Sequence, residues 1–157
     1  MSITLRDATE EDEAFLRHVY ASTREQELAL VPWNEEQREA FLKMQFEAQH
    51  LHYHSHFPEA SYLIILKESE PIGRIYVLRK EEEIRIIDIT LLPQHRNAGI
   101  GTSLIHELLH EADRTGKALN IWVEQFNPSR GLFERLGFLK VEEEGFNYLL
   151  EYRRSEP

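Results

Sequence analysis

The sequence predicts a mixed α/β sheet in a single domain. Helix-like and strand-like apolar patterns alternate along the chain, which is typical of such sheets. The length of 157 residues is that of one ordinary domain, and no internal repeat or low-complexity linker divides it. Apolar residues make up 41% of the chain and charged residues 29%, a composition typical of globular rather than disordered proteins.

The first third of the chain is predicted to form a strand and then two helices. The strand lies at 3–5, and Thr9 after it is an N-cap residue whose following acids suit the positive end of a helix dipole. A second helix is predicted from near Asn34 toward His50, after a loop or short helical turn at 25–33. The apolar face of the first helix is expected to consist of Ala14, Phe15, Leu16 and Val19.

The middle of the chain is predicted to form three antiparallel strands. Residues 62–66 are an apolar run rich in strand formers, and residues 72–78 look like their hairpin partner. A third strand is expected at 84–92, where Pro93 ends it.

The last third of the chain returns to alternating elements. A helix is predicted at 99–116, because its apolar residues fall on one face and Gly116 suits a C-terminal stop. The remaining elements are expected to be a strand at 118–123, a short helix at 128–136, and a strand pair at 138–141 and 146–152.

The charge and cysteine content exclude several functions. With 28 Asp and Glu residues against 18 Lys and Arg residues, the formal net charge is −10, so we expect no nucleic-acid partner, which would require a basic face. The acid excess is either a solubility device or a field that favours cationic substrates such as amines. Because cysteine is absent, the chain has no disulfide, no thiolate nucleophile and no Cys-type zinc site.

The sequence also predicts where the protein resides. Residues 1–7 lack a basic segment followed by a long apolar run. No later segment approaches the roughly 18 consecutive apolar residues of a membrane-spanning helix. We therefore expect a cytoplasmic location and no membrane partner.

The most informative segment is 91–102, where a predicted strand leads through a loop with two glycines into an amphipathic helix. Glycines let the backbone turn tightly and approach a ligand, and the amides at a helix start favour an anion. Arg96 adds a positive charge beside them. Taken alone, the segment is equally compatible with a phosphate site and with a plain connection. Its spacing, Arg96-x-x-Gly99-x-Gly101, fits neither the dinucleotide-binding nor the nucleoside-triphosphatase pattern.

This spacing resembles the coenzyme A motif of the GNAT N-acetyltransferase superfamily, Gln/Arg-x-x-Gly-x-Gly/Ala. A second segment, N-P-S-R-G-L-F-E-R-L-G-F at 127–138, resembles that superfamily's Asn-x-Ala-x-x-Leu-Tyr-x-x-x-Gly-Phe motif. The two motifs, their separation and their flanking elements match the family over nearly the whole chain. The resemblance implies an N-acetyltransferase with acetyl-CoA as acetyl donor and a small-molecule amine or a protein amino group as acceptor.

The resemblance also implies a particular architecture. The family has a mixed, mostly antiparallel sheet of six or seven strands, flanked by about four helices, in which the fourth and fifth strands splay apart to admit the pantetheine arm. In the expected fourth strand, Ile86, Ile89 and Leu91 are spaced by three and then two positions, which suggests a β-bulge. Dimers are common among relatives, so the resemblance is compatible with a homodimer.

The resemblance assigns the coenzyme site residue by residue. Strand residues would meet the pantetheine and the thioester through their backbone, a loop and helix start would hold the diphosphate, and an asparagine would hydrogen-bond the pantetheine arm. The strand residues are Ile89, Thr90 and Leu91; the loop residues are Arg96, Asn97, Ala98, Gly99, Ile100, Gly101 and Thr102; the asparagine is Asn127.

The expected reaction is direct attack of the amine on the thioester with both substrates bound. An aliphatic ammonium has a pKa of about 10.4, so a carboxylate, or a water held by one, must accept its proton. Asp88 is the candidate base because it interrupts the apolar run 86–89, although an outward-facing solvated residue would give the same pattern. Glu124, at the end of the fifth strand, is a second carboxylate with the same two interpretations.

The chain departs from the family at the residue that protonates the leaving thiolate. Many relatives have a tyrosine there, whereas this chain has Phe133, which has no proton to give. Either water or another hydroxyl, such as that of Tyr148, is the acid, or the thiolate leaves unassisted. The departure also leaves open an alternative function, a coenzyme A-binding module with little or no transferase activity that acts through a partner interface.

Four histidines alternate in the sequence, His50, His52, His54 and His56. On a helix they form two pairs with metal-ligand spacing, but the pairs point about 200° apart and cannot share one ion. We therefore predict no metal. The histidines are expected at the end of the second helix and in its loop, where they would bind substrate or titrate near neutral pH.

Overall fold

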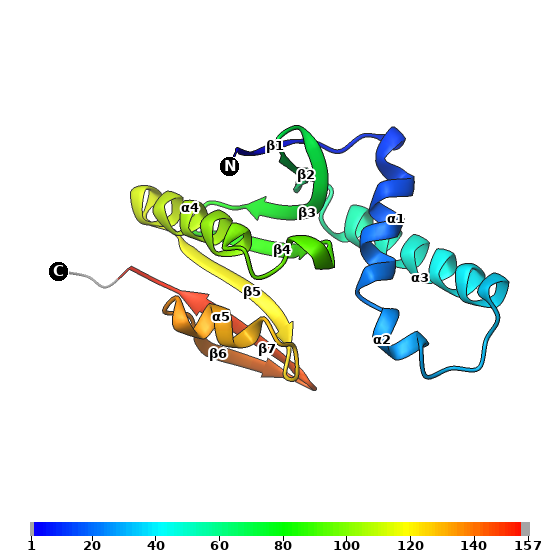
Figure 1. The fold of residues 1–157 in the computed structure, drawn as a ribbon. Coiled ribbons are helices and arrows are strands. Elements are labelled where there is room, and N and C mark those ends of the chain that lie inside the picture. Colours follow the sequence, from blue (N-terminus) through cyan, green and yellow to red (C-terminus); the bar gives the residue numbers. More distant parts are fainter. Residues whose placement is uncertain (1, 155–157) are drawn as a thin grey trace. The chain divides into compact units, whose positions relative to one another are not determined.

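The computed structural model describes residues 2–154 (Figure 1). A strand, a run of helices and three strands are followed by alternating helices and strands, and the chain ends in a strand pair. In chain order the elements are β1 (Ile3–Asp7), the 3-10 turn η1 (Glu10–Asp12), α1 (Glu13–Ser22), α2 (Glu25–Leu28), α3 (Glu35–His56), β2 (Ser61–Lys67), β3 (Glu70–Arg79), β4 (Glu83–Leu91), the 3-10 turn η2 (Pro93–His95), α4 (Ile100–Thr115), β5 (Ala118–Glu124), α5 (Arg130–Arg135), β6 (Leu139–Glu144) and β7 (Asn147–Tyr152).

The strands form one seven-stranded sheet in the order β1-β2-β3-β4-β5-β7-β6. β4 and β5 run parallel, whereas β1 with β2, β5 with β7, and β6 with β7 are antiparallel. The predicted mixed, mostly antiparallel sheet is therefore confirmed. Five α-helices flank it rather than about four, because residues 25–28 close a single helical turn, α2.

The chain divides into two compact units. The first contains the described residues up to Ile75 together with Thr90–Arg96, and the second contains Tyr76–Ile89 and the described residues from Asn97 onward. The divisions fall inside β3 and near the end of β4, so both strands contribute to both units. A single domain stays a prediction from the length.

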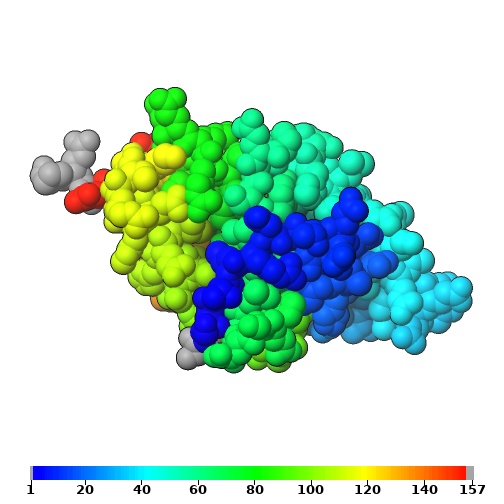
Figure 2. Space-filling model, turned by 90° about the horizontal axis from the view of Figure 1, so that it is seen from above, coloured from blue at the N-terminus to red at the C-terminus, as the bar shows by residue number. Residues whose placement is uncertain are grey.

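In the first unit, β1 pairs with β2, and α1 packs against α3. Figure 1 shows α1 crossing α3, and Figure 2 shows the dark-blue N-terminal segment lying against the cyan α3. The residues buried where these elements meet are Leu16, Tyr20, Phe46 and Ile64. They join the two helices to β2.

The start of the first helix differs from the prediction. The residues after Thr9 form the single turn η1, and α1 follows it. Ala14, which was expected to face the core, is exposed. The reason is that the inward side of α1 is set by Leu16, Val19 and Tyr20, which lie one helical turn apart on the same face.

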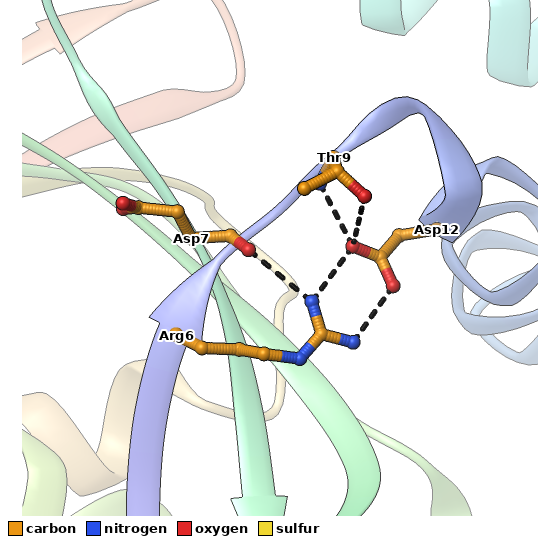
Figure 3. Close-up of polar contacts among 4 residues, drawn as sticks. All are labelled: Arg6, Asp7, Thr9 and Asp12. Atoms are coloured by element: carbon orange, nitrogen blue, oxygen red, sulfur yellow. Dashed lines mark hydrogen bonds and ion pairs between the residues drawn. The ribbon is translucent and has the colours of Figure 1, made fainter.

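An ion pair joins β1 to η1 (Figure 3). The two terminal nitrogens of Arg6 donate to the two carboxylate oxygens of Asp12, each at 2.8 Å. The same carboxylate accepts a hydrogen bond from the backbone N–H of Thr9 at 2.8 Å. The hydrogen bonds from Arg6, more than any other contact, lower the pKa of Asp12 to about 2, although burial acts in the opposite direction.

In the second unit, α4 packs against β5. Its buried side is the predicted apolar face, formed by Ile100, Leu104, Ile105, Leu108, Leu109 and Ala112. Gly99 and Gly116 flank the helix with φ angles of 82° and 69°. Residues without a Cβ adopt this left-handed conformation without strain, so glycine suits both ends.

α3 is longer than predicted. Asn34 is its N-cap, as expected, and accepts a hydrogen bond from the backbone N–H of Gln37 at 2.8 Å. The helix then continues to His56, so all four alternating histidines lie on it and the loop expected around them is wrong. Although α3 has 22 residues, neither it nor any other described helix is long and apolar enough to cross a membrane.

Candidate functional site

The loop before α4 presents backbone donors in the manner predicted. Asn97 and Gly99 have φ angles of 61° and 82°, so the chain turns sharply twice before the helix. Hydrogen bonding within α4 begins with the N–H of Ser103, which donates to the carbonyl of Gly99 at 3.0 Å. The N–H groups of residues 100–102 precede this bond, and the dipole of a 16-residue helix lies behind them. This arrangement suits an anion.

Arg96 is fixed against the end of β4. Its Nε donates to the carbonyl oxygen of Leu91 at 2.9 Å, while the side chain as a whole is exposed. The terminal nitrogens of the guanidinium extend beyond this bond in the planar arrangement that pairs well with phosphate oxygens. The positive charge predicted beside the loop is thus held by a bond to the preceding strand.

β4 and β5 separate before either strand ends. Their parallel register ends where Ile86 pairs with Ile121, whereas β4 continues to Leu91 and β5 to Glu124. The predicted splay of the fourth and fifth strands is confirmed. The register shows no shift up to its last pair, so the bulge expected farther along β4 stays a prediction.

Asp88 lies on the stretch of β4 beyond its register with β5, and it is half-buried. Two positions before it, Ile86 is 1% exposed. Because the predicted bulge falls between Ile86 and Ile89, alternation along the strand does not assign Asp88 to a face. The functional and the solvated interpretations of Asp88 both remain open.

Thr90 and Leu91 belong to the first unit, where β3 contacts them backbone to backbone. The N–H of Leu92 donates to the carbonyl of Ile72 at 2.9 Å. A Cβ added to Gly73 would overlap the carbonyl oxygen of Thr90 and lie 3.0 Å from the Cα of Leu91. Only glycine permits this approach, so β3 supports the segment of β4 predicted to meet the pantetheine.

Asn127 lies exposed in the turn before α5. Its side-chain oxygen accepts hydrogen bonds from the backbone N–H and from the Oγ of Ser129, both at 2.8 Å. The oxygen is therefore engaged in holding the turn. The side-chain amide NH₂ is the group that suits the predicted hydrogen bond to a pantetheine carbonyl.

Phe133, at the position of the family's tyrosine, and Tyr148, the alternative proton donor, lie in different surroundings. Phe133 is 1% exposed and packs edge to face with Phe138, their ring centroids 5.1 Å apart. Tyr148 is half-buried on β7, and its ring lies 4.6 Å from Nζ of Lys140 and 5.5 Å from Cζ of Arg130. Phe133 is therefore a core residue, and the ring of Tyr148 is held by two cation–π contacts.

The histidines of α3 form stacks along the helix. The rings of His50 and His54 lie 4.3 Å apart, between Phe46 on one side and Tyr62 on the other. Burial, followed by the neighbouring His50, lowers the pKa of His54. In residues 2–154, no three His, Asp or Glu side chains are grouped as they would be to hold a metal ion.

An open pocket of about 640 Å³ lies at the C-terminal end of β5. The rings of Phe126 and Phe146 line it together with the carboxylates of Glu124 and Glu144. Only Glu124 was singled out in the sequence as a candidate. The signal that could have identified the rest is a phenylalanine in each of two otherwise polar, acidic turns.

The predicted site residues are distributed over both units. Thr90, Leu91 and Arg96 belong to the first unit. Ile89, residues 97–102 and Asn127 belong to the second, as do Asp88 and Tyr148. Within the second unit, Glu83–Ile86 of β4 pair with Ala118–Ile121 of β5, and α4 packs against β5.

A family comparison agrees with the geometry of the loop. The chain matches the model of the acetyltransferase (GNAT) family over residues 11–138. This span includes the loop before α4, Asn127 and Phe133. No curated protein matches the chain significantly.

Solved structures share the fold over nearly the whole chain. PaiA N-acetyltransferase from Thermoplasma acidophilum, in complex with coenzyme A, has a TM-score of 0.72 and 19% identity, covering 98% of this chain and 100% of that chain. An acetyltransferase from Thermus thermophilus has a TM-score of 0.68 and 17% identity, covering 98% of each chain. The structure of yncA from Salmonella typhimurium, with its cofactor acetyl-CoA, has a TM-score of 0.57 and 20% identity, covering 100% of this chain and 96% of that chain.

Proposed function

Because the chain belongs to the acetyltransferase (GNAT) family, we propose that it is an acetyl-CoA-dependent N-acetyltransferase that acts on a primary amine with both substrates bound. The observation that carries this proposal is the loop before α4. There Asn97 and Gly99 have positive φ, and the amides of residues 100–102 in the same unit supply donors for a diphosphate. Structural relatives solved with coenzyme A or acetyl-CoA support it.

The residues of the loop fit a coenzyme A diphosphate. An added Cβ at Gly99 would meet no other atom within 4 Å, so the loop is open at the point where a ligand would approach. Acetyl-CoA, when bound, supplies the acetyl group as a thioester. In this proposal Arg96, Asn97, Ala98, Gly99, Ile100, Gly101 and Thr102 hold the diphosphate, and Ile89, Thr90, Leu91 and Asn127 hold the pantetheine arm.

The chain's own residues then have three tasks. The acceptor nitrogen forms a bond to the acetyl carbon as the C–S bond breaks, and it must lose a proton. Asp88 accepts that proton, directly or through a water. A backbone N–H group of β4 beyond its register with β5 is proposed to stabilise the negative charge that develops on the carbonyl oxygen. The hydroxyl of Tyr148 or a water protonates the departing thiolate, whose pKa of about 8.5 makes it a tolerable leaving group.

Several parts of the proposal do not rest on this site. From the family, the acceptor is a small-molecule amine or a protein amino group, and a homodimer is compatible with it. The cytoplasmic location stays an expectation from the sequence. Size-exclusion chromatography with light scattering measures the oligomeric state.

The proposal is tested by following thiol release from acetyl-CoA with polyamines, aminoglycosides, amino acids and peptides. We expect release that depends on one class of amine. No release with any class, despite binding of acetyl-CoA, would support the alternative instead, a coenzyme A-binding module that acts through a partner interface. The position of Phe133 in the core, without a hydroxyl, is the observation that favours that alternative.

A further inference from the structure

The pocket at the C-terminal end of β5 is formed by two segments of the second unit. One wall is the end of β5 with the turn after it, and the other is the turn between β6 and β7. The lining residues are Glu124, Phe126, Glu144, Gly145, Phe146 and Asn147. None of them belongs to the coenzyme loop.

The backbone fixes the two walls against each other. The N–H of Gln125 donates to the carbonyl of Phe146 at 2.6 Å, and Glu124 pairs with Asn147 in the β5–β7 register. Gly145 has a φ of 60°, which allows the tight turn between β6 and β7. The backbone of the pocket is therefore fixed before a ligand arrives, which lowers the backbone part of the entropic cost of binding.

Two phenyl rings in this pocket are left in contact with water. Phe126 is 80% exposed and Phe146 is 73% exposed. A single exposed phenylalanine is ordinary, but two that line one pocket provide an apolar surface that a ligand would cover. Aromatic rings favour offset or edge-to-face contact with another ring, and their faces attract cations.

The charged residues of the pocket are all acids. The carboxylates of Glu124 and Glu144 line it, and none of its lining residues is basic. The net charge of −10 reinforces the local field. A ligand with an ammonium group is attracted, whereas a ligand with its own carboxylate is repelled.

The pocket includes the end of β5. The last β4–β5 pair joins Ile86 to Ile121, and Glu124, which lines the pocket, is the last residue of β5. The pocket therefore starts on the part of β5 that lies beyond its register with β4. In the proposed function, the pantetheine and the thioester meet the part of β4 beyond the same register.

From these observations we infer that this pocket binds the acceptor and that the acceptor is an arylalkylamine, a primary ammonium on a short chain from an aromatic ring, without a carboxylate. The inference rests on the proposed function. The rings of Phe126 and Phe146 contact the aromatic body of the acceptor, and Glu124 and Glu144 attract its ammonium group. Asp88 keeps its separate task as proton acceptor.

The test compares four probes at saturating acetyl-CoA. Phenethylamine has a ring and an ammonium, phenylalanine adds a carboxylate, putrescine has ammonium groups without a ring, and 3-phenylpropionate has a ring without an amine. We expect kcat/KM for phenethylamine to exceed that for phenylalanine and for putrescine by about tenfold or more, the size of one charge or ring contact. Equal or higher kcat/KM for putrescine or phenylalanine would overturn the inference.

Variants identify the pocket as the place of binding. Phe126→Ala, Phe146→Ala and Glu144→Gln should each raise KM for phenethylamine by about tenfold and leave kcat within about twofold. The matched controls are Leu139→Ala and Glu142→Gln, exposed positions on β6 that do not line the pocket. An unchanged KM in all three pocket variants, with folding confirmed by circular dichroism, would overturn the assignment.

Direct binding separates this inference from the proposed function. Phenethylamine is titrated calorimetrically into the chain saturated with coenzyme A. Binding that is lost in Phe146→Ala would support the pocket even if no amine were acetylated. Acetylation of another class of amine, with no binding of phenethylamine, would leave the proposed function intact and overturn the inference.

Discussion

A methyl group on Gly73 would overlap the carbonyl oxygen of Thr90. The overlap is with backbone rather than with a flexible side chain, so the end of β4 would have to move. We predict that Gly73→Ala lowers the free energy of unfolding by about 1–3 kcal/mol. It should also weaken acetyl-CoA binding, because Thr90 is among the residues proposed to meet the pantetheine. Urea unfolding and calorimetric titration measure the two effects.

Gly131→Ala is the control for this substitution. Its new methyl group would meet only the terminal nitrogen of Arg135, at 3.3 Å, and a flexible side chain can move aside. Gly131→Ala should therefore leave acetyl-CoA affinity unchanged. If Gly73→Ala bound acetyl-CoA as tightly as the unsubstituted chain, β3 would have no part in supporting the pantetheine segment.

Gly99 and Gly116 provide a matched pair at the two ends of α4. Both have positive φ and both face open space, so an alanine at either position costs about 1 kcal/mol or slightly more of backbone strain. Only Gly99 lies in the proposed diphosphate loop. We expect Gly99→Ala and Gly116→Ala to destabilise the free protein similarly, whereas acetyl-CoA should raise the melting temperature of Gly116→Ala much more than that of Gly99→Ala. Equal shifts would argue against the loop as the diphosphate site.

The Arg6–Asp12 pair predicts a pH dependence of stability. The pKa of Asp12 is about 2 in the folded chain, against an ordinary value of 3.8. The unfolded state therefore takes up a proton first as the pH falls, and the stabilisation, complete above the unfolded pKa, is lost as the pH falls through the folded pKa.

As the pH falls from 3.8 to about 2, the free energy of unfolding should decrease by about 1–2 kcal/mol more in the unsubstituted chain than in Asp12→Asn. The difference is modest because the side chain of Arg6 is 41% exposed. Denaturant unfolding at several pH values measures it. Asp7→Asn is the control, since Asp7 accepts from Arg6 through its backbone oxygen only. Parallel pH curves for Asp12→Asn and the unsubstituted chain would contradict the assigned pair.

Asp88 is the proposed base, and Asp88→Asn is expected to separate binding from turnover. The substitution preserves shape but removes the proton acceptor, so acetyl-CoA affinity should stay the same while kcat falls by about 100-fold or more. The dependence of kcat/KM on pH should change as well. Glu82→Gln, in the exposed turn before β4, is the control. An unchanged pH profile in Asp88→Asn would remove this carboxylate from the mechanism.

The parts of the fold that follow from local patterns could be predicted from the sequence. β2 and the helix between Gly99 and Gly116 follow from apolar periodicity and from glycine at the helix ends. The histidine-rich end of α3 could not be predicted, because its residues have no apolar period. There the ring of His54 stacks on Tyr62, which is contributed by β2.

The candidate site also has a part that could be predicted from the sequence and a part that could not. The loop before α4 could be recognised because the diphosphate site proposed there depends on backbone geometry, which Gly99 and Gly101 indicate in the sequence. At the end of β5, each phenylalanine stands out in its own acidic turn, but the proximity of Phe126 and Phe146 could not be predicted because they are distant in sequence. They are brought together by the register between β5 and β7, which a local pattern does not reveal.

Acetyl transfer to an amine is tested by mass spectrometry of the amine after incubation with acetyl-CoA. We expect one N-acetylated product for each thiol released, and no product from the heat-denatured chain. Thiol release without an acetylated amine would show hydrolysis instead. Tight binding of acetyl-CoA with neither product would contradict the transferase and indicate a coenzyme-binding module.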